Sequence, residues 1–550
     1  MKHRVAALSA SLLLAAACSL INATDDLKPV EPSDAGGTSN GGTTGGTQTV
    51  NDGGDAGASL GGGGANPAGG DGNSAGIGGC GDDCAAGGMG GESGAPPIGE
   101  RCTDSEADCG STAPICDGAT SACRACASDK ECSNELGLDY CATTGSAKGR
   151  CIACKTDDDC SSTKPVCGPL GQCRACSEHS ECVTHVCGAN GECTAQDKAV
   201  YVLAVTGDTS QNCGTLTAPC RFLSTAVGKL SSARPNLVLL ETNQVQSDAT
   251  ATFPSLPGGM TQFRVIGNKG VIRPYTGLAS FIVPVGVSVL FDDVVLEGTT
   301  GDANGEDPAG NPVAAIQCQG GQIVVQNSTI RNNVTGIRAI DCDVSIYGSL
   351  IEKNAPGATY GASALEAYCM TAGCNKKFDV RRNRFIDNGV ASYSGGHMEA
   401  VYENNLFLRN GADGYVRVIE LRSQHTRFAY NTLVGNFNGC TYVGVVACDE
   451  GVCDNIGNIS YGSFPDEMSP CYDQVWYGGV LSYNLTETPF PGTANKSGDP
   501  LFVDPAKGDY TPGPGSPAID KGKPNDAPAL DINGNPRPAA APDMGAFEAQ

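Results

Sequence analysis

Residues 380–388 read VRRNRFIDN and residues 402–410 read YENNLFLRN, two copies of one phrase that ends on asparagine. In five such copies, the residues three and eight places before the final asparagine are apolar, and the residue five places before it is serine or asparagine. The final residues are Asn333, Asn354, Asn388, Asn410 and Asn436, spaced by 21, 34, 22 and 26 residues. Repeats of this length that carry short alternating strands are typical of solenoids, so we predict an all-β chain coiled as a parallel β-solenoid.

The columns have a physical reason, because successive coils of a parallel solenoid lie ~4.8 Å apart and place each position over its counterpart. Apolar columns then form a continuous core. A column of asparagines can pass amide hydrogen bonds from coil to coil, and asparagine tolerates the left-handed backbone of a sharp turn. We therefore predict that the five asparagines form a structural ladder.

The overall charge restricts the partners. The 550 residues include 60 acidic and 35 basic side chains, a net charge of −25. Nucleic acid binding needs a basic face, so we predict no nucleic-acid partner.

The N-terminus has the pattern of an export signal. Lys2 and Arg4 precede an apolar run over residues 5–17, which ends at Cys18. Residues 1–18 resemble a bacterial lipoprotein signal, which implies lipidation of Cys18 and, with Ser19 after it, delivery to the outer membrane or cell surface. The alternative is a plain secretory signal and a secreted protein. Because no later run approaches ~20 apolar residues, a lipid anchor is the only membrane attachment that we expect.

Residues 19–100 are rich in glycine, alanine, serine and threonine and carry almost no large apolar side chain. Such a segment cannot bury a core, so we predict a disordered linker. Cys80 and Cys84 interrupt it, and we expect them to form a small disulfide loop.

Residues 101–197 form a cysteine-rich array of four units with four cysteines each. The units are Cys102, Cys109, Cys116 and Cys123; Cys126, Cys132, Cys141 and Cys151; Cys154, Cys160, Cys167 and Cys173; and Cys176, Cys182, Cys187 and Cys193. Cys-x-x-Cys pairs in this array also fit zinc or redox sites. Each such pair straddles a unit boundary, however, and a unit of ~25 residues needs staples in place of a core. We predict two disulfides per unit, with three connectivities open, and no metal.

Residues 198–498 contain the repeats. The stretch from Tyr201 to Leu230 resembles the entry segment of bacterial right-handed parallel β-helix proteins, which implies that handedness and a capped first coil. Further disulfides are expected among Cys213, Cys220, Cys318, Cys342, Cys369, Cys374, Cys440, Cys448, Cys453 and Cys471.

Residues 499–550 include the phrases Asp499-Pro500-Leu501-Phe502, Gly515-Ser516-Pro517-Ala518-Ile519-Asp520 and Asp543-Met544-Gly545-Ala546-Phe547-Glu548. They resemble the closing segment of the choice-of-anchor Q class of bacterial surface β-helix proteins. The resemblance implies an exported surface protein without an assigned activity. We expect this segment to seal the C-terminal end of the solenoid.

Basic residues concentrate between Lys376 and Arg427 despite the overall acidity. One interpretation is an ion-pair stripe that holds coils in register. The other is a contact face for an acidic glycan, with the contacts Arg381, Arg384, Arg409, Arg417, Arg422 and His397. Tyr393 is also of a type that stacks on sugars. No catalytic constellation is recognisable.

The loops 302–307 and 531–534 are rich in oxygen ligands. They suggest calcium but equally fit plain turns, and we expect no other cofactor.

These patterns favour a cell-surface lipoprotein whose β-helix binds a glycan or another surface ligand, or mediates adhesion, without catalysis. A polysaccharide lyase or glycosidase acting on an acidic polysaccharide is the alternative, and a structural envelope component is a third. The oligomeric state is not defined by the sequence.

Overall fold

The computed structural model describes residues 115–550 with gaps at 118, 120, 133–136, 241–244, 248–250, 253–260, 275–278, 280, 303–305, 307–311, 357–361, 372, 412–417, 437–444, 449–450 and 464–475. The predicted signal, linker and Cys80–Cys84 loop lie outside the described residues, as do Cys102, Cys109, Cys440 and Cys471. The chain divides into a unit over residues 33–126 and a unit that contains residues 127–550. The described part of the first unit is a hairpin of β1 (Ile115–Asp117) and β2 (Ala122–Arg124).

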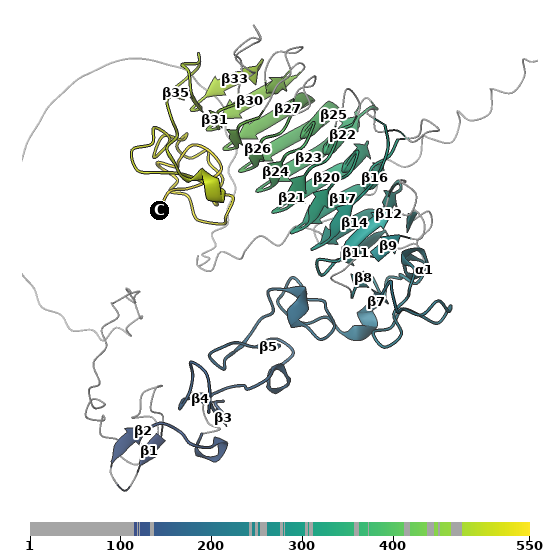
Figure 1. Cartoon of the computed structure of the whole chain (residues 1–550), viewed down its shortest axis with the longest axis vertical. Helices are drawn as coiled ribbons and strands as arrows, with labels where there is room; N and C mark the ends of the chain where they lie inside the picture. The colour runs from purple at the N-terminus through teal and green to yellow at the C-terminus, as the bar shows by residue number, and fades with distance from the viewer. Residues whose placement is uncertain are drawn as a thin grey trace, which may run out of the picture. The chain divides into compact units, whose positions relative to one another are not determined.

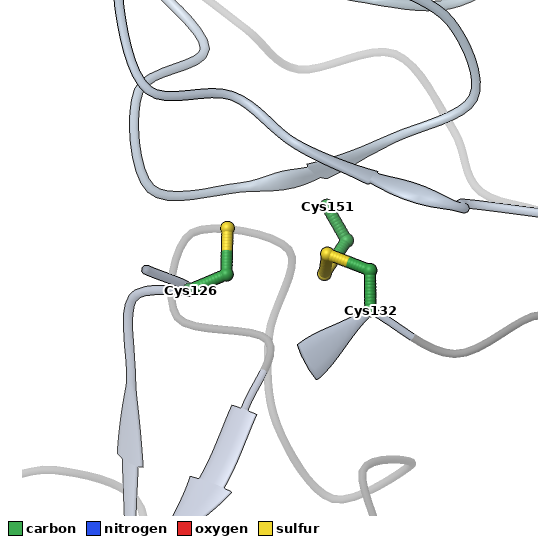
Figure 2. A group of neighbouring side chains, drawn as sticks. All are labelled: Cys126, Cys132 and Cys151. Atoms are coloured by element: carbon green, nitrogen blue, oxygen red, sulfur yellow. A yellow bond between two sulfur atoms is a disulfide. The ribbon is translucent and has the colours of Figure 1, made fainter. Parts of the chain in front are cut away.

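Two of the cysteine-rich units share one complete disulfide pattern. In the third and fourth units the first cysteine pairs with the third and the second with the fourth: Cys154–Cys167, Cys160–Cys173, Cys176–Cys187 and Cys182–Cys193. Figure 2 shows the Cys132–Cys151 bond of the second unit, which also joins the second cysteine to the fourth. Cys116, Cys123, Cys126 and Cys141 are disulfide-bonded as well. Among the described residues, the cysteines that lie close enough to share a metal ion are therefore held in disulfides.

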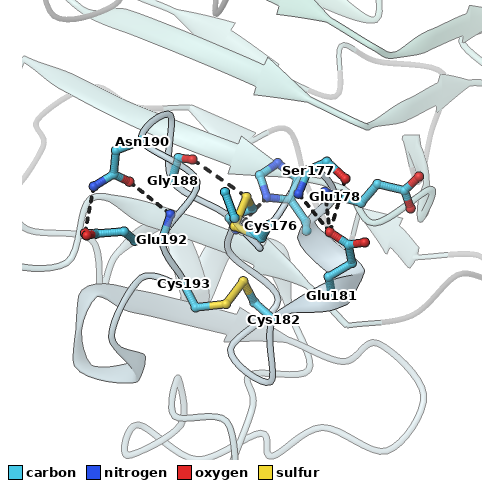
Figure 3. The surroundings of a disulfide bond; sticks show 12 residues. Cys176, Ser177, Glu178, Glu181, Cys182, Gly188, Asn190, Glu192 and Cys193 are labelled. Atoms are coloured by element: carbon cyan, nitrogen blue, oxygen red, sulfur yellow. Dashed lines mark hydrogen bonds between the residues drawn. A yellow bond between two sulfur atoms is a disulfide. The ribbon is translucent and has the colours of Figure 1, made fainter. Parts of the chain in front are cut away.

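The acidic phrase between the first two cysteines of a unit forms a short 3-10 helix with a capping box. These helices are η3 (Asp129–Glu131), η5 (Asp157–Asp159) and η6 (His179–Glu181). The carboxylate at the third helical position accepts backbone N–H groups at the helix start, as Glu181 does from Ser177 and Glu178 (Figure 3). Short two-stranded ladders follow, β3 (Tyr140–Cys141) with β4 (Cys151–Ile152) and β5 (Val166–Cys167) with β6 (Cys173–Arg174).

The fourth unit is bonded to the first coils of the solenoid. His179 Nε2 lies 3.0 Å from Asp292 Oδ2, and the Cys187 backbone N–H donates to His179 Nδ1. The His179 side chain is only 10% exposed. The short helices η7 (Gln196–Lys198) and α1 (Leu223–Val227) and the Cys213–Cys220 disulfide complete the entry segment.

From β7 onwards the chain winds into stacked coils, each with strands on up to three faces (Figure 1). Face A contains β10 (Ala251–Thr252), β13 (Phe281–Val283), β16 (Ile316–Gln319), β19 (Ile337–Ile340), β22 (Leu365–Cys369), the first halves of β25 (Ser392–Glu403) and β27 (Ile419–Ala429), β29 (Val446–Cys448) and β32 (Trp476–Tyr477). Face B contains β7 (Ala199–Val202), β8 (Asn236–Leu239), β11 (Gln262–Ile266), β14 (Ser288–Asp292), β17 (Gln322–Gln326), β20 (Asp343–Tyr347), β23 (Lys376–Arg381), the second halves of β25 and β27, β30 (Val452–Ile456) and β33 (Val480–Ser482).

Face C contains β9 (Val245–Ser247), β12 (Val271–Pro274), β15 (Val295–Glu297), β18 (Thr329–Arg331), β21 (Leu350–Glu352), β24 (Arg384–Ile386), β26 (Leu406–Leu408), β28 (Thr432–Val434), β31 (Ile459–Tyr461), β34 (Leu485–Thr486) and β35 (Lys496–Ser497). Neighbouring coils pair in parallel throughout. Parallel crossovers are right-handed in nearly all proteins. The predicted fold class, a right-handed parallel β-helix behind a disulfide-rich array, is confirmed.

The asparagine ladder runs through the turn between face C and face A. Each Nδ2 from Asn333 to Asn410 donates to Oδ1 of the next asparagine at 2.9–3.0 Å, and Asn436 continues the column to Ser463. The serine-or-asparagine column five places earlier is a second ladder. It begins at Ser328 and Ser349 and continues through Asn383, Asn405, Asn431, Asn458, Asn484 and Asn495.

The left-handed residue of each turn is the one before the ladder residue, and not the asparagine itself. In the first ladder this position has φ near +50° to +60° at Asn332, Lys353, Asp387, Arg409 and Gly435. The ladder asparagine then follows in the normal region, where its side chain points inward and is fully buried. The strain is repeated in every coil, and the ladder's hydrogen bonds offset it.

The C-terminal segment corrects our expectation that it seals the solenoid end. It lies against the side of face C, where Tyr510, Ile532 and Phe547 pack on Leu406 and Leu408. The physical reason is the sequence of face C itself: one outward position is charged at Glu297, Arg331 and Glu352 but apolar at Ile386, Leu408 and Val434. This segment includes the antiparallel pair β36 (Phe502–Asp504) and β37 (Asp509–Pro512), joined by η9 (Pro505–Lys507).

Within the described part of the chain, no helix has the length and apolar character needed to cross a membrane.

Candidate functional site

The outward side of face A carries two adjoining rows of polar and aromatic side chains. Parallel pairing places Arg338, Glu366, Tyr393 and Glu420 in register on consecutive coils. Two residues further along these strands, Tyr368, Gly395 and Arg422 form the second row. We call the six side chains Arg338, Glu366, Tyr368, Tyr393, Glu420 and Arg422 the face A cluster. The inward residues between them, such as Ala367 and Leu421, are buried in the core.

The first pair in the cluster is a loose ion pair. Arg338 Nε lies 3.4 Å from Glu366 Oε2, and both atoms are buried without a hydrogen-bond partner. Glu366 is 8% exposed. Burial raises the pKa of Glu366 to about 7, although the Arg338 guanidinium acts in the opposite direction. A carboxyl group on this face therefore titrates near neutral pH.

Two tyrosines cover the centre of the cluster. The rings of Tyr368 and Tyr393 meet edge to face with centroids 6.5 Å apart, and Arg338 Nη2 lies 3.4 Å from the Tyr368 hydroxyl. Gly395 makes room for this arrangement, because a Cβ there would lie 2.9 Å from the Tyr393 hydroxyl oxygen. Neither tyrosine is fully buried, so both rings reach the surface of the face.

The second ion pair of the cluster lies one coil beyond Tyr393. Arg422 Nε is 2.7 Å from Glu420 Oε1, on the same strand. The cluster thus alternates guanidinium, carboxylate and aromatic ring along the coil axis, a combination that suits the hydroxyl groups, acidic groups and apolar faces of sugars.

Face B carries charges that are closely paired. Glu403 is 6% exposed, and its two carboxylate oxygens bind guanidinium groups of both neighbouring coils: Arg381 at 3.1 Å and Arg427 at 2.6 Å. Arg381 also pairs with Asp379, and Arg427 with Asp526 of the C-terminal segment. These groups hold one another and leave little for a ligand.

The predicted basic stripe is dispersed over several faces. Arg381 lies on face B, whereas Arg384 lies on face C and donates to Asn533 of the C-terminal segment. Arg409 occupies a turn and pairs with Asp387, and Arg422 belongs to face A. His397 is exposed at the bend between faces A and B, and Arg417 lies outside the described residues. The five described residues do not form one contact surface.

Sequence reasoning missed Arg338, Glu366, Tyr368 and Glu420. The signal was present, since each follows or precedes an inward apolar residue in strands such as 337–340 and 365–368. Insertions of different length separate these strands from the preceding asparagine, so no constant spacing aligned them. Tyr393 was considered, and the structure brings it between Glu366 and Glu420.

In the structure, the two oxygen-rich loops proposed for calcium contain internal hydrogen bonds. Asp531 accepts backbone N–H bonds from Asn533, Asn535 and Glu548 and a side-chain bond from Asn535. Donors of this kind stabilise a turn and occupy the oxygen atoms that a cation needs. Of the loop 302–307, only Asp302 and Glu306 are described, and the Glu306 N–H donates to Asp302.

The disulfides of the β-helix lie inside it or close its loops. Cys318 and Cys342 connect neighbouring coils, as their spacing of about one coil suggested. Cys369–Cys374 and Cys448–Cys453 each bridge five residues.

The described fold and cluster define a disulfide-rich parallel β-helix protein with a polar, aromatic outer face. No protein-family model matches the chain. No curated protein matches it either. Among solved structures, the crystal structure of pectate lyase Pel9A is similar, with a TM-score of 0.40 and 13% sequence identity, covering 64% of this chain and 97% of that chain. At this level of similarity, the pectate lyase indicates nothing about the activity of this chain.

Proposed function

We propose that this chain is an exported cell-surface protein whose β-helix binds a polysaccharide along face A without cleaving it. The observation that carries the proposal is the face A cluster, in which two partly buried tyrosines lie between the Arg338–Glu366 pair and the Glu420–Arg422 pair. Coils stacked ~4.8 Å apart present such groups repeatedly along one line, which suits an extended chain of sugars.

The setting on the cell surface rests on the sequence. Residues 1–18 resemble a lipoprotein signal with Cys18 as the lipidated residue, and the C-terminal segment resembles a class of surface proteins. The disulfides of the cysteine-rich array fit an oxidising compartment outside the cytoplasm. Secretion without a lipid is the alternative, and mass spectrometry of the N-terminal peptide from the native membrane fraction distinguishes the two.

A glycan array probed with the purified full chain tests the binding. We expect Tyr393→Ala to weaken binding of any glycan that scores by about two- to twelvefold, because an aromatic contact is worth about 0.5–1.5 kcal/mol beyond its buried area. Tyr347→Ala is the matched control, since Tyr347 is an outward tyrosine on face B, where it donates to Asp379. An array without a single bound glycan would contradict the proposal and favour a structural envelope component.

A glycosidase is a second candidate, favoured by one observation. Glu366 and Glu420 lie in one outward row, two coils apart, with Tyr393 between them. Inverting glycosidases hold their two carboxyl groups about 6.5–9.5 Å apart, and two coils span ~9.6 Å. Product analysis of every glycan that binds decides between the two: new reducing ends that disappear in Glu420→Gln would establish hydrolysis, and unsaturated sugars would establish a lyase.

A further inference from the structure

The Arg338–Glu366 pair is unusual among the ion pairs of this molecule. Several other pairs form direct hydrogen bonds, as Arg409 does with both oxygens of Asp387 and Arg427 does with Glu403. Glu366 Oε2 is the one carboxylate oxygen, within the described ranges, that is buried without a hydrogen-bond partner. Arg338 Nε in front of it is equally unbonded. The two side chains therefore attract each other by charge but do not form a hydrogen bond between these atoms.

The surroundings of Glu366 offer little compensation for its charge. Arg338 on the preceding coil is the cation that faces it, with Tyr368 on its own strand and Tyr393 on the next coil. Glu420 and Arg422 lie one coil further and pair with each other, and Glu306 acts on Arg338 by charge alone. Since burial raises the pKa of Glu366 to about 7, small changes of pH around neutrality decide whether Arg338 has a counter-ion.

Arg338 is placed to use a different counter-ion. Its side chain is 18% exposed, and its Nη2 atom lies beside the Tyr368 hydroxyl, at the edge of the two-tyrosine surface. A guanidinium group with free N–H donors binds a carboxylate in a planar, two-bond arrangement, which the present Glu366 contact does not achieve. A sugar ring on the tyrosines would bring a uronate carboxylate to this position.

Building on the proposed glycan binding, we propose that face A takes an acidic, uronate-containing polysaccharide. In this arrangement Arg338 binds the sugar carboxylate, and Glu366 competes with the ligand for Arg338. Protonation of Glu366 releases the arginine, so binding strengthens as the pH falls through neutrality. Neutral glycans, which contact the tyrosines alone, bind without this pH dependence.

The test is a calorimetric titration of the full chain with alginate oligosaccharides at pH 6 and pH 8, with cello-oligosaccharides as the neutral probe. If only the form with protonated Glu366 binds alginate well, affinity is about tenfold higher at pH 6 than at pH 8. We expect Glu366→Gln to bind at both pH values as tightly as the original chain binds at pH 6. Arg338→Met should lose alginate binding at both. Glu352→Gln, which alters an arginine–glutamate contact on face C, is the matched control and should change nothing.

The outcomes separate the two proposals. Cello-oligosaccharide binding without alginate binding, or alginate binding that is equal at pH 6 and pH 8, would overturn this inference and leave glycan binding at face A standing. Failure of every glycan to bind would overturn both. Thermal unfolding of each variant at both pH values shows that a lost titration signal reflects the face and not a loss of folding. Glu366→Gln is not expected to unfold the chain, because the substitution removes a buried charge.

Discussion

Faces A and B carry the same kinds of residue, but the Arg338–Glu366 pair of face A is arranged differently from the Glu403 network of face B. On face B, the Glu403 carboxylate binds Arg381 of the preceding coil and Arg427 of the following coil. On face A, Arg338 and Glu366 stand opposite each other without a hydrogen bond between their nearest atoms. The difference indicates that stacked coils can use ion pairs to fix the register between coils, or can leave a charged group available to bind a ligand. Bond geometry distinguishes the two cases where residue type does not.

The largest effect should come from breaking the face B network. Glu403→Ala leaves two partly buried guanidinium groups without their shared carboxylate, and loss of one partner from a buried pair costs about 3–5 kcal/mol. Urea unfolding of the full chain followed by circular dichroism measures this change. A loss below about 1 kcal/mol would show that Glu403 does not hold the coils together.

The corresponding change on face A should have the opposite sign. The pKa of Glu366 is raised in the folded chain to about 7 from an ordinary value of 4.5, so its contribution to stability is full below about pH 4.5 and is lost as pH rises through 7. We expect Glu366→Gln to be more stable than the original chain at pH 8, by up to about 3 kcal/mol, and close to equal at pH 4.5. Unfolding curves at the two pH values measure the difference. A variant that is less stable at pH 8 would mean that the Arg338–Glu366 pair holds the coils together like its face B counterparts.

The smallest effect should come from an exposed pair in the turn. Arg409 binds both oxygens of Asp387, but its side chain is 54% exposed. Exposed ion pairs contribute about 0–1 kcal/mol to stability. Arg409→Ala should therefore change the free energy of unfolding by less than about 1 kcal/mol and leave glycan binding unchanged. A marked loss of glycan binding in this variant would indicate that the turn contacts the glycan and would argue against face A as the binding surface.

The sequence was sufficient for the ladders and insufficient for the outer faces. Asn388 and Asn410 could be aligned because the strand of face C between the two ladders has a constant length, and buried amides tolerate no shift. Glu366 could not be placed, because the insertion over residues 355–362 breaks the spacing before its strand. Whether Arg381 is free or paired depends on Glu403 in another coil, a contact that no spacing within one repeat reveals.

The position of the C-terminal segment was also not predictable from spacing within one repeat. Its phrases suggested a cap, but the apolar outward residues Leu406 and Leu408 determine where it packs. The Leu408 position is Glu352 two coils earlier and Ile386 in the preceding coil, and only the coil register identifies it as outward. Asn458 and Asn484 were likewise missed as ladder members, since the residues five places after them are Ser463 and Pro489 and not asparagine.

Hydroxyl-radical footprinting of the full chain with and without a bound glycan tests the division between the two faces most directly. Tyrosine side chains oxidise readily when exposed, and both faces carry outward tyrosines in neighbouring coils. If face A is the binding surface, the glycan protects Tyr368 and Tyr393 and leaves Tyr347 on face B unchanged. Protection of Tyr347 with no change at Tyr368 and Tyr393 would contradict the account.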